Sequence, residues 1–156
     1  MSLHPATSEL VAVAWILSLP DWAPGMCSTQ LPKDQNSWAE RGFCVVGPDV
    51  SGSQNPTVPW GESVHQIEFR AVNPNSLRPD YGLAAALGQR VANAAVAGLS
   101  LNTPLTLRTG WHGARVTGAI PRGLRRIPTD PSSYALYRMD LALNWVQADL
   151  EEGEQS

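Results

Sequence analysis

The alternation of apolar and polar residues between Val64 and Val72 constrains the fold more than any other feature of the sequence. Ile67, Phe69 and Ala71 point to one side of an extended chain, and the polar residues between them point to the other. From Asp80 the period changes to that of a helix, with apolar residues recurring at helical spacing as far as Ala95. The sequence therefore predicts a half-buried strand that is followed by an amphipathic helix.

The other predicted elements surround this pair. An apolar helix is predicted over residues 5–19, short strands over 43–46 and 105–109, a continuation of the sheet over 114–120, and a long bent strand over 134–145. Residues 121–131 are basic and rich in turn formers, so they are predicted as a loop. Together these elements predict an α+β fold, with a mainly antiparallel sheet of four to five strands flanked by two main helices.

The length of 156 residues and the 43% hydrophobic content predict a single domain over residues 1–148 and a flexible acidic tail over 149–156. The helix at 5–19 is apolar nearly all round, so either the rest of the domain or a neighbouring subunit should cover it on more than one side. Its apolar run is too short to span a bilayer and has no basic residue before it. With two cysteines and no CxxC motif, the chain is predicted to be a cytoplasmic protein with free thiols, without a membrane partner.

Charge is distributed unevenly along the chain. Residues 81–129 contain no acid and six arginines, whereas acidic residues gather near the C-terminus. This asymmetry is typical of a nucleic-acid surface, of complementary patches that meet between copies, or of solvated arginines. Direct DNA binding through Arg122, Arg125 and Arg126 is one hypothesis, although no aromatic residue is interleaved with these arginines.

Six tryptophans are more than a single core of this size needs, and four of them fall in or beside predicted loops. Tryptophan and arginine carry a large share of the energy at protein interfaces, while the alternative is that these rings close the ends of a small sheet. The candidate interface residues are Trp22, Trp38, Trp60, Trp111, Arg108, Arg115, Arg122, Arg125 and Arg126.

No motif of strong chemical meaning is present, and the three histidines lie far apart without cysteine neighbours, so no metal or cofactor is predicted. His112 carries the enzyme hypothesis, because it lies in a glycine-flanked turn beside Trp111. A general base there would need an orienting carboxylate from Asp80, Asp130 or Asp140. A small enzyme or ligand-binding domain centred on His112 is therefore the alternative to a non-catalytic protein.

The order of elements resembles the tail-terminator or head-to-tail connector proteins of long-tailed (siphovirus-like) bacteriophages. The resemblance rests on the helix at 5–19, the strands FCVVG (43–47) and IEFRA (67–71), the helix at 81–97, VTGAIPR (116–122), PTDP (128–131) and YRMDL (137–141). It covers most of the chain through a layout of elements and not through one invariant motif.

The resemblance implies a structural virion protein, not an enzyme, that is assembled in the host cytoplasm and located in the neck. It implies a hexameric ring that caps the tail tube and joins the tail to the head connector. The partners implied are further copies of the chain, the tail-tube protein, the head-completion or stopper protein, and DNA that passes through the lumen without sequence-specific binding. Such a ring needs heterologous contacts, and the separated basic and acidic regions suit them.

Overall fold

The chain folds around one curved sheet, as a computed structural model shows for residues 3–33, 38, 41–51, 59–72, 78–128 and 134–148. The elements in chain order are α1 (Ser8–Leu17), β1 (Cys27–Ser28), β2 (Phe43–Asp49), β3 (Trp60–Ala71), α2 (Tyr81–Ala97), β4 (Ala114–Ile127) and β5 (Ala135–Gln147). The predicted acidic tail at 149–156 lies outside the described residues.

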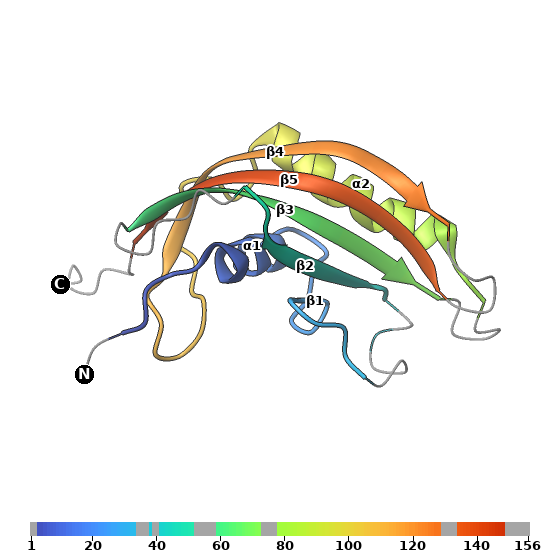
Figure 1. The fold of residues 1–156 in the computed structure, drawn as a ribbon, viewed down its shortest axis with the longest axis horizontal. Coiled ribbons are helices and arrows are strands. Elements are labelled where there is room, and N and C mark those ends of the chain that lie inside the picture. The colour runs from blue at the N-terminus through green and yellow to red at the C-terminus, as the bar shows by residue number, and fades with distance from the viewer. Residues whose placement is uncertain are drawn as a thin grey trace.

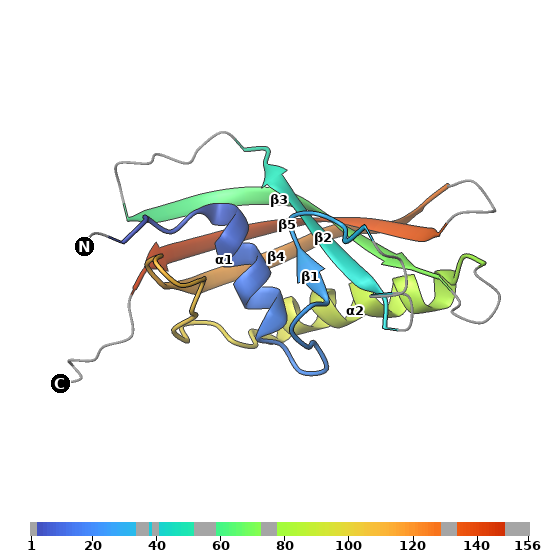
Figure 2. The same cartoon turned by 90° about the horizontal axis from the view of Figure 1, so that it is seen from below.

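The strands follow the order β1-β2-β3-β5-β4. The β1–β2 pair is parallel, and the other pairs are antiparallel. In Figure 1 the sheet forms an arch with α1 beneath it, and Figure 2 shows the helical side of the arch. The predicted α+β class, with two main helices and a mostly antiparallel sheet, is confirmed.

The two longest predicted strands form the centre of the sheet. β3 and β5 pair without a break from Trp60 opposite Val146 to Ala71 opposite Ala135. On β3 the predicted inward residues Ile67, Phe69 and Ala71 are fully buried, so this part of the prediction is confirmed. The alternation works because each strand has one face against the helices and one face without a helix.

The predicted helix after β3 is α2, and its ends are capped as the sequence allows. The carboxylate of Asp80 accepts a hydrogen bond from the backbone N–H of Leu83 at 3.0 Å. Gly98 ends the helix in the left-handed conformation (φ 72°), which glycine adopts without steric cost. Leu87 and Val91 are fully buried against the sheet, and α2 shares one hydrophobic core with α1.

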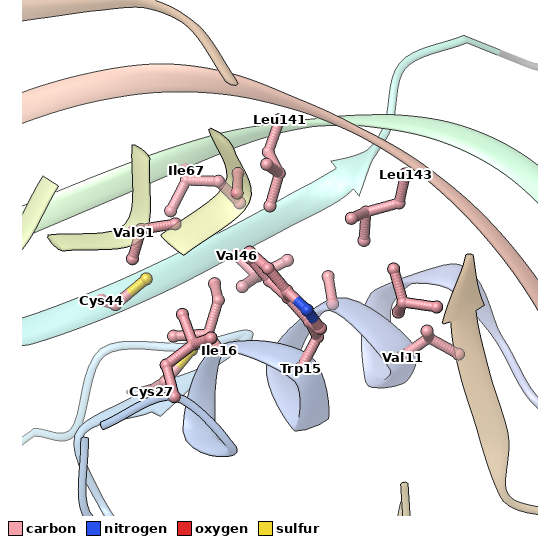
Figure 3. Close-up of a cluster of buried hydrophobic side chains, with 14 of the residues drawn as sticks. Val11, Trp15, Ile16, Cys27, Cys44, Val46, Ile67, Val91, Leu141 and Leu143 are labelled. Carbon is pink, nitrogen blue, oxygen red and sulfur yellow. The ribbon is translucent and has the colours of Figure 1, made fainter. Parts of the chain in front are cut away.

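The other wall of this core is α1. Val11, Trp15 and Ile16 are fully buried beneath the sheet, and Figure 3 shows them packed toward Val46 and Leu143. The indole N–H of Trp15 also donates to the carbonyl of Leu99 at 3.2 Å, which links α1 to the segment after α2. One face of the predicted apolar helix is thus covered by its own domain.

The secondary structure predicted for two segments is wrong. Residues 121–127 are not a loop but the second half of β4, which pairs with β5 as far as Ile127 opposite Leu136. Residues 105–109 are not a strand, because only Leu105 forms a bridge, with Ala114. The physical reason in both places is the tertiary partner: β5 supplies hydrogen bonds to a segment with turn-forming residues, and none of the described strands pairs with residues 106–109.

Candidate interaction surfaces

The face of the sheet turned away from α1 and α2 carries charged side chains across its central strands. On β3, Glu62, Gln66 and Glu68 alternate with buried residues of the opposite face. β5 continues these rows, because Gln66 pairs with Asp140 and Glu68 pairs with Arg138. Period-two patterning on two paired strands therefore builds one continuous polar surface, which is called the open face below.

Glu68 is the centre of a hydrogen-bond network on the open face. Its carboxylate accepts from the guanidinium of Arg70 on the same strand and from Arg138 Nη2 on β5 at 2.8 Å. Burial acts to raise the pKa of Glu68, but the hydrogen bonds from the two guanidinium groups outweigh it and lower the pKa. Arg70 also donates to the hydroxyl of Tyr134 at 2.7 Å. This network stabilises the strand pair, and its charges already have partners.

The far edge of the sheet is strongly basic. β4 contains Arg115, Arg122, Arg125 and Arg126 and no acidic residue. Arg122, Arg125 and Arg126 are exposed, and Arg125 Nη1 donates to the carbonyl of Gly123 at 2.8 Å. The guanidinium carbon of Arg126 lies 3.7 Å from the centre of the Tyr81 ring, a cation–π contact with α2. The sequence region predicted to be a basic loop is thus a basic strand edge.

The backbone of this edge is irregular. The register of β4 against β5 shifts between Val116 and Gly118 and again between Arg122 and Arg125, and Pro121 removes a backbone donor. Bulges, proline and exposed cations are the devices that prevent an edge strand from pairing with another chain. Contacts at this edge are therefore expected through side chains and not through an added strand.

The opposite side of the sheet has the opposite charge. β2 and β3 contain the acidic residues Asp49, Glu62 and Glu68 against the single cation Arg70. Since Glu68 is paired with Arg70 and Arg138, the excess negative charge of this side comes from Asp49 and Glu62. Asp49 caps the turn after β2, where its carboxylate accepts from the backbone N–H groups of Ser51 at 2.9 Å and Val64 at 3.0 Å. The two sides of one sheet thus differ in charge, so the basic side of one copy attracts the acidic side of another.

The four candidate tryptophans divide into two groups. Trp22 and Trp38 are buried, with 7% and 4% of their surface exposed, so these two rings follow the alternative of internal packing and offer no exposed ring to a partner. Trp22 belongs to the main core, and Trp38 packs in a small cluster with Phe43 and Val72 at the end of the sheet. A position beside a loop does not decide exposure, because small satellite cores form under loops.

The other two tryptophans reach the surface. Trp60 is 53% exposed at the start of β3. Trp111 is half-buried, with its ring centre 4.8 Å from that of His4 and 5.7 Å from the guanidinium carbon of Arg108. Of the nine candidate interface residues, the structure groups Trp111 with Arg108 in one loop and the β4 arginines on one edge.

An apolar groove lies along the outer side of α1, where sequence reasoning placed no site. One side of the groove is α1, which contributes the half-buried residues Leu10, Val13, Ala14 and Leu17. The other side is the segment 104–108, which ends at the exposed Arg108. The groove has a volume of about 330 Å³. The signal that could have found it is the absence of a polar side on this helix.

His112 lies in the turn before β4, and its backbone N–H donates to the carbonyl of His4 at 2.9 Å. The carboxylates proposed to orient it are elsewhere: Asp80 caps α2, and Asp130 is outside the described residues. Asp140 lies seven residues along β5 from Gln147, the partner of Ala114, which is about 20 Å along a strand. No described carboxylate from the predicted set is therefore placed to orient His112.

Within the described ranges no group of three or more histidine, cysteine, aspartate or glutamate residues is arranged to hold a metal ion. No helix among them is long and apolar enough to cross a membrane.

The comparisons with known proteins are sparse. No protein-family model and no curated protein sequence matches the chain. Among solved structures, a chain from the virion of a native gene transfer agent particle matches at 15% sequence identity. The match covers 92% of this chain and 87% of that chain, with a TM-score of 0.41.

Proposed function

We propose that the chain is a structural protein of a bacteriophage neck, which forms a ring of six copies that caps the tail tube and joins the tail to the head connector. The partners in this proposal are neighbouring copies, the tail-tube protein and a head-completion protein, and DNA passes through the lumen. The proposal starts from the resemblance in the order of elements, and the surfaces of the folded chain support it.

The observation that carries the proposal is the separation of unlike surfaces on one subunit. The β4 edge has four arginines without an acid, while β2 and β3 have three acids and one arginine. Surfaces of opposite charge attract each other between copies, whereas like surfaces repel. When the basic patch of one copy meets the acidic patch of a second copy, and its own acidic patch meets a third copy, the contacts are heterologous and build closed rings if the rotation between subunits closes.

Assembly in the presence of partners tests the proposal. The chain should form particles of one defined order, seen by electron microscopy and by light scattering, when it is mixed with tail-tube or neck proteins. A free monomer alone is compatible with it, because such subunits can oligomerise on docking. Monomeric behaviour both alone and in every mixture would contradict the proposal.

The two alternatives give different results. If the chain is an enzyme centred on His112, the His112→Ala variant should assemble normally and lose an activity. If it is a DNA-binding protein, it should be retained on DNA at low salt, and retention should fall steeply as salt rises. We expect only weak retention, because the net charge is −3 and only three of the exposed arginines, Arg122, Arg125 and Arg126, gather on the β4 edge.

A further inference from the structure

The side of α1 that is turned away from the sheet is apolar. A helix that packs on one sheet normally turns polar residues toward solvent. Here Val11, Trp15 and Ile16 face the core, while Leu10, Val13 and Leu17 on the other side line the groove. The segment 104–108 covers this side only in part, so the groove offers apolar area to a further side chain.

Trp60 is an exposed side chain that is apolar, as the groove is. Among the large apolar side chains that are exposed in the described part of the chain, it is the only aromatic one. It pairs across the sheet with Val146, which is itself 37% exposed, so the two form an exposed apolar pair. Tryptophan is the residue most enriched among the side chains that dominate interface energies.

The charged residues beside Trp60 and beside the groove have opposite signs. Glu62 is exposed two residues after Trp60, and the alternation of β3 places both on the open face. Arg108 is exposed at the end of the wall that borders the groove. If Trp60 enters the apolar groove, the carboxylate of Glu62 can approach the guanidinium of Arg108. A paired apolar contact and ion pair favour a single docking orientation.

The two surfaces cannot meet within one subunit. Trp60 and Glu62 lie on the open face, whereas α1 packs against the opposite face through residues such as Trp15. Contact between them thus requires a second copy, and each copy would use one surface toward each neighbour. This is a heterologous contact, the type that propagates around a ring.

We propose that Trp60 of one copy inserts into the groove between α1 and residues 104–108 of the next copy, with Glu62 facing Arg108. The inference rests on the proposed ring and names one of its subunit contacts. The occupant of the groove is a second copy of this chain, because both halves of the contact are present on the same subunit.

A pair of truncations tests the anchor. Trp60→Ala should raise the protein concentration needed for half-maximal ring formation by about tenfold or more. Val96→Ala, at a side chain of α2 that is 80% exposed, is the matched control and should leave assembly unchanged. Thermal unfolding of both variants should resemble that of the wild type, which separates lost assembly from lost folding.

A cross-link tests the geometry. After addition of a mild oxidant, the variant with Glu62→Cys and Arg108→Cys should form disulfides between copies in assembled rings, giving a ladder of covalent multimers. The pair Glu62→Cys with Val96→Cys should not. The native thiols do not compete, because Cys27 and Cys44 are both buried and burial raises the pKa of the Cys44 thiol.

The outcomes distinguish this contact from the ring itself. Rings that form without the cross-link, and with Trp60→Ala assembling like the wild type, would overturn the contact and leave the neck proposal standing. A wild-type chain that never assembles with any neck or tube partner would overturn both.

Discussion

His65 is a histidine inside the core whose ionisation burial opposes. It is fully buried, its Nδ1 lies 2.8 Å from the carbonyl oxygen of Gly47, and its Nε2 lies 3.0 Å from Ser63 Oγ. Since the carbonyl can only accept, Nδ1 carries the proton of the neutral ring and Nε2 accepts from the Ser63 hydroxyl. The neutral imidazole therefore satisfies both neighbours.

Protonation of His65 should make folding depend on pH near neutrality. Burial lowers the pKa of His65 from its ordinary value of 6.5, although the Gly47 carbonyl and the carboxylates of Asp49 and Glu9 oppose this shift. Because folding lowers the pKa of His65, its contribution to the free energy of unfolding is complete above pH 6.5. It is lost as pH falls from 6.5 through the folded-state pKa, because the unfolded chain binds the proton first.

The measurement is the free energy of urea unfolding between pH 5.5 and 8. In the wild type it should fall below pH 6.5, by at most about 1.4 kcal/mol per pH unit from this group. His65→Gln should be less stable by about 1–3 kcal/mol at pH 8 and should show a flatter slope. Equal slopes in both proteins would contradict the assignment. The pKa of Glu68 is lowered from 4.5, so its contribution is lost at lower pH than this window.

Residue types alone indicated the chemistry of the surface but not the partners of each group. The clustering of arginines was readable from the sequence, whereas the network of Glu68 with Arg70 and Arg138 joins residues 70 positions apart and depends on strand register. The tryptophans show the same limit. Nothing local separates the buried Trp38 from the exposed Trp60, because exposure depends on what packs over each ring.

The pairing of β3 with β5 contains a position that only glycine fits. A Cβ at Gly61 would lie 2.9 Å from the ring of Trp145, which is 2% exposed and donates from its indole nitrogen to Ser8 Oγ at 3.1 Å. Gly61→Ala should therefore displace a large core ring, and the cost should be about 1–3 kcal/mol.

Gly118→Ala is the matched control on β4, since its Cβ would lie 3.5 Å from Asn144 Nδ2, an ordinary contact. This variant should stay within about 0.5 kcal/mol of the wild type. For a chain of this size Gly61→Ala should lower the melting temperature by roughly 2–10 °C and Gly118→Ala by much less. A comparable loss in both variants would show that strand flexibility, and not contact with Trp145, decides the result.

The elements that were predictable were those whose periodicity survives in the sequence. β3, α2 and β5 keep an unbroken period because each has a continuous buried face. β4 was predicted only to residue 120, since its two register shifts break the alternation and Pro121 and Gly123 resemble a turn. Its second half is a strand because β5 extends far enough to pair with it, which no local pattern reports.

The residues that stabilise the fold and those available for contacts with other copies lie on different surfaces of the folded chain. The helices bury one face in a shared core, while the open face with its two oppositely charged sides and the groove on the outer side of α1 are left for interaction. The candidate surfaces were thus partly predictable. Their arginines were visible in the sequence, but the groove along α1 arises only where residues 104–108 pass the helix.

This separation predicts different consequences for two charge-introducing substitutions. Leu87 is fully buried between α2 and the sheet, so Leu87→Asp should abolish folding by placing an unpaired carboxylate in the core. Arg125 is exposed on β4, so Arg125→Glu should keep the melting temperature within a few degrees of the wild type and weaken assembly. Arg90→Glu, at an exposed position of α2, is the control for charge reversal alone.

Circular dichroism on heating would report folding, and light scattering with the tube or neck partner would report assembly. We expect Arg125→Glu to require at least several times more protein for ring formation, because an anion then faces the acidic side of the neighbouring copy. Arg90→Glu should assemble like the wild type, since Arg90 is exposed on α2 and belongs to none of the strands β2, β3 and β4. If Arg125→Glu unfolded the chain as Leu87→Asp does, β4 would be part of the folding core and its edge would not be an assembly surface.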